Sequence, residues 1–96
     1  MLFTDKIKEL RQKEQLPQRR LAAALDIDTA TYCKIEKGER KARKEQVLTL
    51  ASAFGVDENE LLTLWLADKV TNMVAGNKSV ASNALSIAAK SINTTL

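Results

Sequence analysis

The sequence predicts an all-α fold, in which five helices form a bundle and one extra helix follows at the C-terminus. Apolar residues recur at spacings of three and four along most of the chain, which is the period of a helix with one buried face. Pro17, Gly38, Gly55 and Gly76 interrupt this pattern where turns between helices are expected. No alternation of apolar and polar residues is long enough to predict a strand, so the pattern favours helices throughout.

The first helix is expected over residues 5–14. Thr4 or Asp5 can supply its N-cap, since both side chains accept hydrogen bonds from free backbone N–H groups. The second helix is expected over residues 18–25, directly after Pro17, whose fixed φ suits a helix start.

The third helix is expected over residues 29–37, after a turn at residues 26–28. We expect the Ile27 side chain to pack into the core between the second and third helices. Asp28 is a good N-cap for the third helix, and Gly38 can supply the left-handed residue at which it ends.

The fourth helix is expected over residues 44–54, with Gly55 as its stop. Asp57 can cap the fifth helix, expected over residues 58–75. Glu60 follows three residues later, as in a capping box.

The extra C-terminal helix can be capped by Ser79, and its apolar stripe is Val80, Ala84, Leu85, Ala88 and Ile92. Together with apolar residues late in the fifth helix, this stripe lies beyond a complete five-helix unit and needs a partner. It can fold back within the chain or meet a second copy, because both arrangements have the same sequence signature. A homodimer through the fifth or the last helix is the favoured interpretation.

The composition argues against several function classes. The 96 residues include no histidine, which removes the commonest general base and a major metal ligand. A single cysteine cannot form an internal disulfide or build a zinc site. We therefore expect no catalytic residue, no metal site and no cofactor, and no small-molecule ligand is evident. A reduced, cytoplasmic setting fits best.

The hydropathy pattern also argues against a membrane protein. The N-terminus turns charged at once, unlike a signal peptide. The longest nearly apolar run, residues 61–67, is far shorter than the roughly 20 residues that a membrane span needs.

The net charge of +3 is unevenly distributed. Residues 1–44 carry twelve Lys and Arg against seven Asp and Glu, whereas residues 45–75 carry one against five. Residues 76–96 add two lysines. The basic charge therefore coincides with the second and third helices, as a phosphate-facing surface would require.

The third helix has two different faces when its residues are placed about 100° apart. One face, small near the helix start and cationic further along, consists of Thr29, Ala30, Cys33, Lys34 and Lys37. The opposite face, expected to pack on the core, consists of Thr31, Tyr32 and Ile35. A helix that lies in the major groove of DNA needs this combination.

These residues predict two classes of DNA contact. Base edges are expected to meet Thr29, Ala30 and Lys34, through a hydroxyl, a methyl group and an ammonium that can reach guanine. The expected contacts with the DNA backbone come from Gln18, Arg19, Lys37, Arg40, Arg43 and Lys44. Gln18 begins the second helix, where free N–H groups and the helix dipole favour a phosphate.

Simpler interpretations exist for each feature. Alone, the charge run at residues 40–44 would be a solvated surface, and only the two-helix context favours DNA. Cys33 is more simply a small neutral residue than a redox group. The acidic cluster at residues 57–60 is more simply a helix start than a catalytic carboxylate pair.

Four segments carry a resemblance to a known family: IKELRQKEQL, PQRRLAAALDID, TATYCKIEKGER and LTLASAFGVDENELL. They resemble the phage repressor and Cro-like helix-turn-helix family of the xenobiotic-response-element type, and are similar to restriction–modification controller proteins. The resemblance covers about residues 5–64. It implies a lambda-repressor-like DNA-binding bundle over residues 1–64, and leaves residues 65–96 as a helical extension for dimerisation or packing.

The resemblance further implies that the third helix enters the major groove, with Thr29, Ala30 and Lys34 at the bases and Gln18 at a phosphate. It implies an ion pair between Arg11 and Glu36. Two departures stand out. Asp26 occupies a turn position where the family usually has glycine, and the loop after Gly38 is unusually basic and lacks the frequent proline.

The sequence thus predicts a repressor-type or controller-type transcriptional regulator that binds a double-stranded DNA operator as a homodimer. Half-sites of such dimers lie about 34 Å apart. The alternative is a protein-interaction module, such as an antitoxin or antirepressor, that grips its partner through the C-terminal helices. An enzyme is disfavoured, because the chain lacks histidine, a phosphate-binding glycine-rich loop and a metal-ligand cluster.

Overall fold

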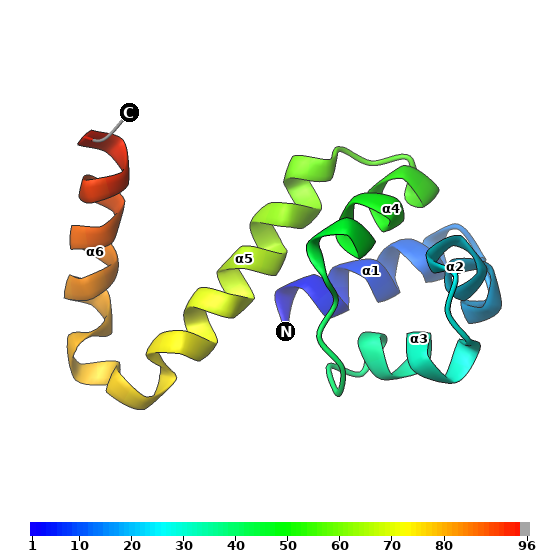
Figure 1. Cartoon of the computed structure of the whole chain (residues 1–96), viewed down its shortest axis with the longest axis horizontal. Helices are drawn as coiled ribbons and strands as arrows, with labels where there is room; N and C mark the ends of the chain where they lie inside the picture. The colour runs from blue at the N-terminus through cyan, green and yellow to red at the C-terminus, as the bar shows by residue number, and fades with distance from the viewer. Residues whose placement is uncertain (95–96) are drawn as a thin grey trace.

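Residues 1–94 are described in a computed structural model, and they form six α-helices and one short 3-10 helix. The elements are α1 (Leu2–Lys13), α2 (Gln18–Leu25), α3 (Thr29–Glu36), α4 (Lys44–Phe54), α5 (Glu58–Val74), η1 (Ala75–Asn77) and α6 (Lys78–Thr94). Figure 1 shows α1 to α4 and the first half of α5 gathered into a bundle, from which α5 leads away to α6. The prediction of an all-α bundle with an extra C-terminal helix is confirmed.

One apolar core holds the bundle together. Its largest fully buried side chains are Tyr32, Ile7, Leu21, Ile35, Leu50, Leu61 and Val47, which come from all five helices α1 to α5. Leu25, Ile27, Leu64 and Trp65 pack against this core from its edges. Full burial of each large aliphatic side chain stabilises the fold by about 1.5–3 kcal/mol, so this shared core fixes how α2 and α3 sit relative to α1.

The turn between α2 and α3 agrees with the prediction from the sequence. Asp26 adopts the left-handed conformation, with φ of 58°. The N–H of Ile27 donates to the carbonyl of Ala22 at 3.0 Å, which closes the end of α2. The Asp28 side chain then accepts from the N–H of Thr31 at 2.7 Å and starts α3.

Glycines end two helices as expected. Gly38, after α3, and Gly55, after α4, have φ of 79° and 68°, a region that disfavours residues with a Cβ. The next helix, α5, is capped by Asp57, whose carboxylate accepts from the N–H of Asn59 at 3.0 Å. The carboxylate of Glu60 lies 3.6 Å from the Lys6 ammonium, so Glu60 links α5 to α1.

The start of α1 differs from the expectation. The helix begins at Leu2, before Thr4 and Asp5, and neither residue is its N-cap. Asp68 in α5 takes that role, because its two carboxylate oxygens accept from the N–H groups of Leu2 at 3.0 Å and Phe3 at 2.9 Å. The cap therefore comes from a helix distant in sequence. The residues around the start of α1 give no sign of it.

The second half of α5 contacts α1 through Asp68 and then, followed by η1 and α6, extends away from the bundle (Figure 1). Ser79 is not an N-cap, because α6 begins at Lys78 directly after the 3-10 turn. No side chain of α6 is buried in the part of the chain that the structure describes. Large apolar side chains are exposed here: Leu66, Val70, Met73, Val80, Leu85, Ile87 and Ile92. No helix among the described residues is long and apolar enough to cross a membrane.

Candidate nucleic-acid interface

The outer face of α3 is the centre of the candidate site. Thr29, Ala30 and Lys34 are exposed, whereas Tyr32 and Ile35 are buried in the core. This division follows from the helical period, since the exposed residues lie on the side of α3 opposite the core. The surface offered by α3 is narrow and sterically small near its N-terminus, with a cation about one turn later.

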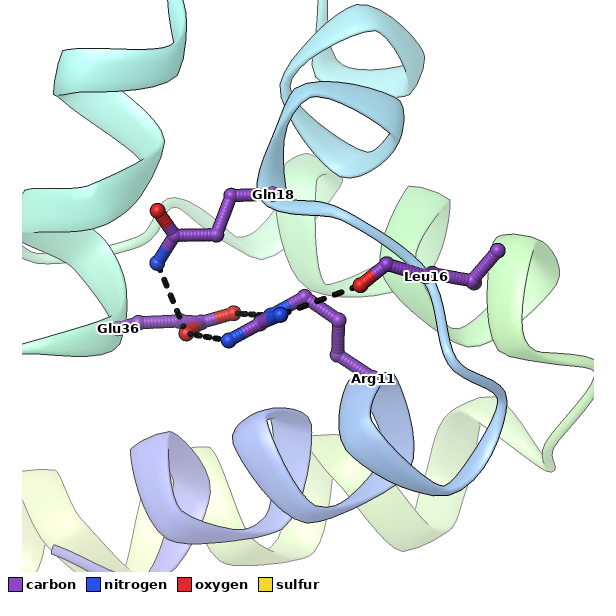
Figure 2. Close-up of polar contacts among 4 residues, drawn as sticks. All are labelled: Arg11, Leu16, Gln18 and Glu36. Carbon is purple, nitrogen blue, oxygen red and sulfur yellow. Dashed lines mark hydrogen bonds and ion pairs between the residues drawn. The ribbon is translucent and has the colours of Figure 1, made fainter.

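A polar network fixes the C-terminal end of α3 against α1 and α2. The Arg11 Nε donates to Glu36 Oε2 at 2.7 Å, and the Arg11 Nη2 donates to Glu36 Oε1 at 3.1 Å. Gln18 Nε2 donates to the same Oε1 at 3.2 Å, and Arg11 Nη1 donates to the carbonyl of Leu16 at 3.1 Å. Figure 2 shows these four residues converging from three segments of the chain. The two-pronged contact fixes the guanidinium plane as well as its distance.

This network controls the charge beside the exposed face. The Glu36 side chain is only 3% exposed and that of Arg11 15% exposed, so the pair is largely withdrawn from water. Burial acts to raise the pKa of Glu36, but Arg11, Tyr32 and Gln18 outweigh it and leave that pKa below its ordinary value. Hydrogen bonding to Glu36 raises the pKa of Arg11. The negative charge of Glu36, which would repel a phosphate, is therefore balanced by the positive charge of Arg11.

Tyr32 completes the buried side of α3. It is fully buried, and burial followed by the neighbouring Glu36 carboxylate raises the pKa of its phenol. The phenol therefore stays protonated at neutral pH. It lies on the core face of α3, as the helical period predicts.

The basic loop after α3 is held in place at both ends. The N–H groups of Glu39 and Arg40 both donate to the carbonyl of Lys34, at 2.9 and 3.2 Å. At the far end, the N–H of Arg43 donates to Gln46 Oε1 at 2.9 Å, where α4 begins. The loop therefore presents its cations from a defined backbone.

Trp65 anchors the middle of this loop from α5. Its indole Nε1 donates to the carbonyl of Ala42 at 2.9 Å, and the Ala42 side chain is buried. The expected division of the chain at residue 64 falls inside α5, immediately before Trp65. Trp65 and Asp68 both bind segments of the bundle, and no signal in the local sequence pattern indicates either contact.

The structure places the predicted backbone-contacting residues as follows. Gln18 is half-buried and held by Glu36, and the exposed residues are Arg19, Lys37, Arg40, Arg43 and Lys44. The guanidinium of Arg43 lies 3.6 Å from Glu45, with both side chains exposed. The Gln18 side chain donates to Glu36, and the backbone N–H of Arg40 donates to the carbonyl of Lys34, so both residues contact the C-terminal half of α3. Arg43 and Lys44 instead lie at the start of α4.

Asp28 is one anion beside these cations. A hydrogen bond from Thr31 lowers the pKa of Asp28, and Lys34 and Arg40 lower it further. The carboxylate therefore stays charged at neutral pH, although its role is to cap α3. Lys34 and Arg40 together carry more positive charge than the negative charge of Asp28, so the surface around Asp28 still attracts an anion.

Comparison with known proteins gives a consistent result. The family model described as "Helix-turn-helix" matches residues 7–61. The chain is 33% identical over 72 residues to the cryptic phage CTXphi transcriptional repressor RstR of Vibrio cholerae, an alignment that covers 75% of this chain and 61% of that protein. The chain therefore spans less than two thirds of the length of this relative. No solved structure matches the chain.

Proposed function

The chain belongs to the helix-turn-helix family, and from this premise we propose that it is a DNA-binding transcriptional regulator that places α3 in the major groove. The observation that carries the proposal is the pairing of Glu36 with Arg11 directly behind an exposed, small and cationic helix face. The pairing with Arg11 removes the repulsion that the Glu36 carboxylate would exert on a phosphate bound at the adjacent surface.

The proposed DNA contacts fall into two groups, according to whether a side chain can reach the base edges or the DNA backbone. We assign Thr29, Ala30 and Lys34 to base edges, since they project from the exposed face of α3. The DNA backbone is assigned to Gln18, Arg19, Lys37, Arg40, Arg43 and Lys44. Backbone contacts set the register and much of the affinity, whereas base contacts set the sequence preference.

Gln18 has a second role in this proposal. One N–H of its side-chain amide is used by Glu36, and the amide carries another N–H that can donate to a phosphate. Glu36 thereby orients Gln18 at the first residue of α2, where the helix dipole also favours an anion.

The regulator is proposed to act as a homodimer through the exposed apolar side chains of α6 and those of α5 at Leu66 and Val70. Residues 1–64 supply the DNA-binding part, and residues 65–96 supply dimerisation, apart from Trp65 and Asp68, which bind the bundle. Isolated apolar side chains on a surface are common, but a succession along two neighbouring elements favours an interface. A two-fold dimer would read half-sites about 34 Å apart on one face of the duplex.

A repressor acting in the cytoplasm is the form of regulation that the similarity to a phage repressor favours. A partner protein gripped by α6, as in an antitoxin or antirepressor, is the second candidate, because the same exposed apolar side chains would serve it. Sedimentation of the pure protein separates the two. A dimer mass supports the homodimer, whereas a monomer at all concentrations supports a separate partner.

The decisive experiment selects binding sites from random duplex DNA and reads them by sequencing. We expect an inverted repeat with half-sites one helical turn apart, and an affinity that falls steeply with salt, with a log–log slope of about −0.9 per phosphate contacted. Equal affinity for selected and random DNA at every salt concentration would overturn the proposal of a specific regulator.

A further inference from the structure

A hollow of about 490 Å³ lies beside the basic loop, a feature that the sequence did not indicate. It is open to solvent on one side and is bordered by the N-terminal end of α1, the loop between α3 and α4, and the middle and C-terminal half of α5. Apolar groups make most of its wall, from Phe3, Ile35, Ala42, Trp65 and Met73. Its volume and its mainly apolar lining are compatible with a small organic molecule.

The charged groups around this hollow are mainly cationic. Arg40 and Lys41 line it from the loop and Lys69 lines it from α5. The Lys69 ammonium lies 3.8 Å from the centre of the Trp65 ring, so one cation already sits over the apolar wall. The single anion in the lining, Asp68, has both oxygens occupied by the start of α1.

This charge pattern selects among possible occupants. The only charged side chains of α6 are Lys78 and Lys90, so α6 of a second copy would offer no anionic side chain to these cations. A neutral apolar molecule would contact the wall but make no use of the cations at the rim. A molecule with an apolar body and one anionic group satisfies both the wall and the rim.

We propose that this hollow binds a small organic anion, an aryl or alkyl carboxylate, and that its binding weakens the hold of the protein on DNA. The same loop links the two events. Arg40 is assigned both to the DNA backbone and to the rim, and the Trp65 indole that forms the wall also holds the loop at Ala42. An anion that draws Arg40 inward therefore competes with a phosphate, and DNA must reciprocally weaken the anion. The coupling rests on the proposed DNA-binding function, whereas the site does not.

The test uses the full chain and 3-phenylpropionate, with 3-phenylpropan-1-ol as the neutral match and inorganic phosphate as the anion without an apolar body. Trp65 is the only tryptophan, so its fluorescence reports on the wall of the hollow. We expect a saturable change with 3-phenylpropionate, a response at least about tenfold weaker with the alcohol, and none with phosphate. Equal affinities for the carboxylate and the alcohol would overturn the proposal.

Two matched variants locate the site. Lys69→Gln removes one rim cation that has no assigned DNA contact, and should weaken 3-phenylpropionate about tenfold while leaving the affinity for DNA in its absence unchanged. Lys90→Gln, in α6, is the control and should bind like the unmodified chain. Unchanged binding in Lys69→Gln would place the ligand elsewhere and overturn the site.

The coupling is measured by fluorescence anisotropy of a labelled duplex. Saturating 3-phenylpropionate should raise the Kd for DNA about fivefold in the unmodified chain and have little effect in Lys69→Gln at the same concentration. If fluorescence responds and DNA binds with unaltered affinity, the site stands and the coupling is overturned. If fluorescence responds and no DNA is bound, the proposed function has failed but the site stands. If ligand affinity falls as protein concentration rises through dimerisation, the hollow is a seam between copies and the proposal is wrong.

Discussion

The carboxylate of Asp68, in α5, caps α1 at Phe3, 65 residues earlier in the chain. The second oxygen of the same carboxylate accepts from the N–H of Leu2, and α1 has no capping side chain of its own. One acidic side chain therefore satisfies two of the free N–H groups at the start of α1 and joins the first helix to the fifth.

Asp68→Ala is expected to lower the free energy of unfolding by about 1 kcal/mol, the usual cost of losing a helix cap. Asn72→Ala, an exposed position one turn further along α5, is the control. Urea denaturation followed by circular dichroism measures both. Ala favours a helix more than Asp or Asn does, so neither variant should lose stability through helix propensity in α5. Equal losses in the two variants would show that the cap is not responsible.

Arg11→Met is expected to cost about 3–5 kcal/mol, because it leaves the Glu36 carboxylate buried without its cation. The double variant Arg11→Met/Glu36→Met should recover much of this loss, since two apolar side chains can replace a buried pair at small cost. Arg19→Met, at an exposed position, serves as the control and should be close to neutral. A double variant less stable than Arg11→Met would contradict this account.

Glu36 also predicts how stability responds to acid. Its pKa is lowered in the folded protein, so the contribution of the ionised pair is fully present above the ordinary value of 4.5 and is lost as the pH falls through the folded pKa. The stability advantage of the unmodified chain over Glu36→Gln should therefore be greatest near neutral pH and shrink below pH 4.5. Denaturation curves of both proteins across this range check the sign. An advantage that grows on acidification would contradict it.

Trp65→Phe keeps an aromatic ring but removes the indole N–H that binds the Ala42 carbonyl. We expect a loss of about 1 kcal/mol in stability and faster amide hydrogen exchange in the basic loop. If the loop carries backbone contacts, affinity for all duplexes should fall to a similar degree. Unaltered exchange in residues 39–43 would show that the loop does not depend on this bond.

Lys34→Ala and Arg43→Ala should separate sequence preference from general affinity. Lys34 projects from α3, so its loss should cost about 1–3 kcal/mol on the selected site and relax preference at one position. Arg43 lies at the start of α4, so its loss should weaken selected and random duplexes alike and lower the salt slope by about one. Identical profiles for the two variants would undo the division between base and backbone contacts.

Much of the fold could be predicted because its signals are local. The bounds of α2 and α4, the left-handed residue Gly38 and the cap at Asp28 depend on side chains and backbone within a few positions of one another. The two faces of α3 also follow from the sequence, because helical periodicity decides which residues can share a face. The start of α1 could not be found in this way, since its cap lies in α5.

The sequence alone therefore determined an all-α bundle, the family-like pattern of about residues 5–64 and the exposed residues of α3, since short-range periodicity and capping chemistry specify them. Only the tertiary structure decided that Asp68 caps α1, that Trp65 holds the basic loop, and that a hollow opens between them. These contacts join segments tens of residues apart, and their existence depends on how the packed core orients α5 across α1 and the loop.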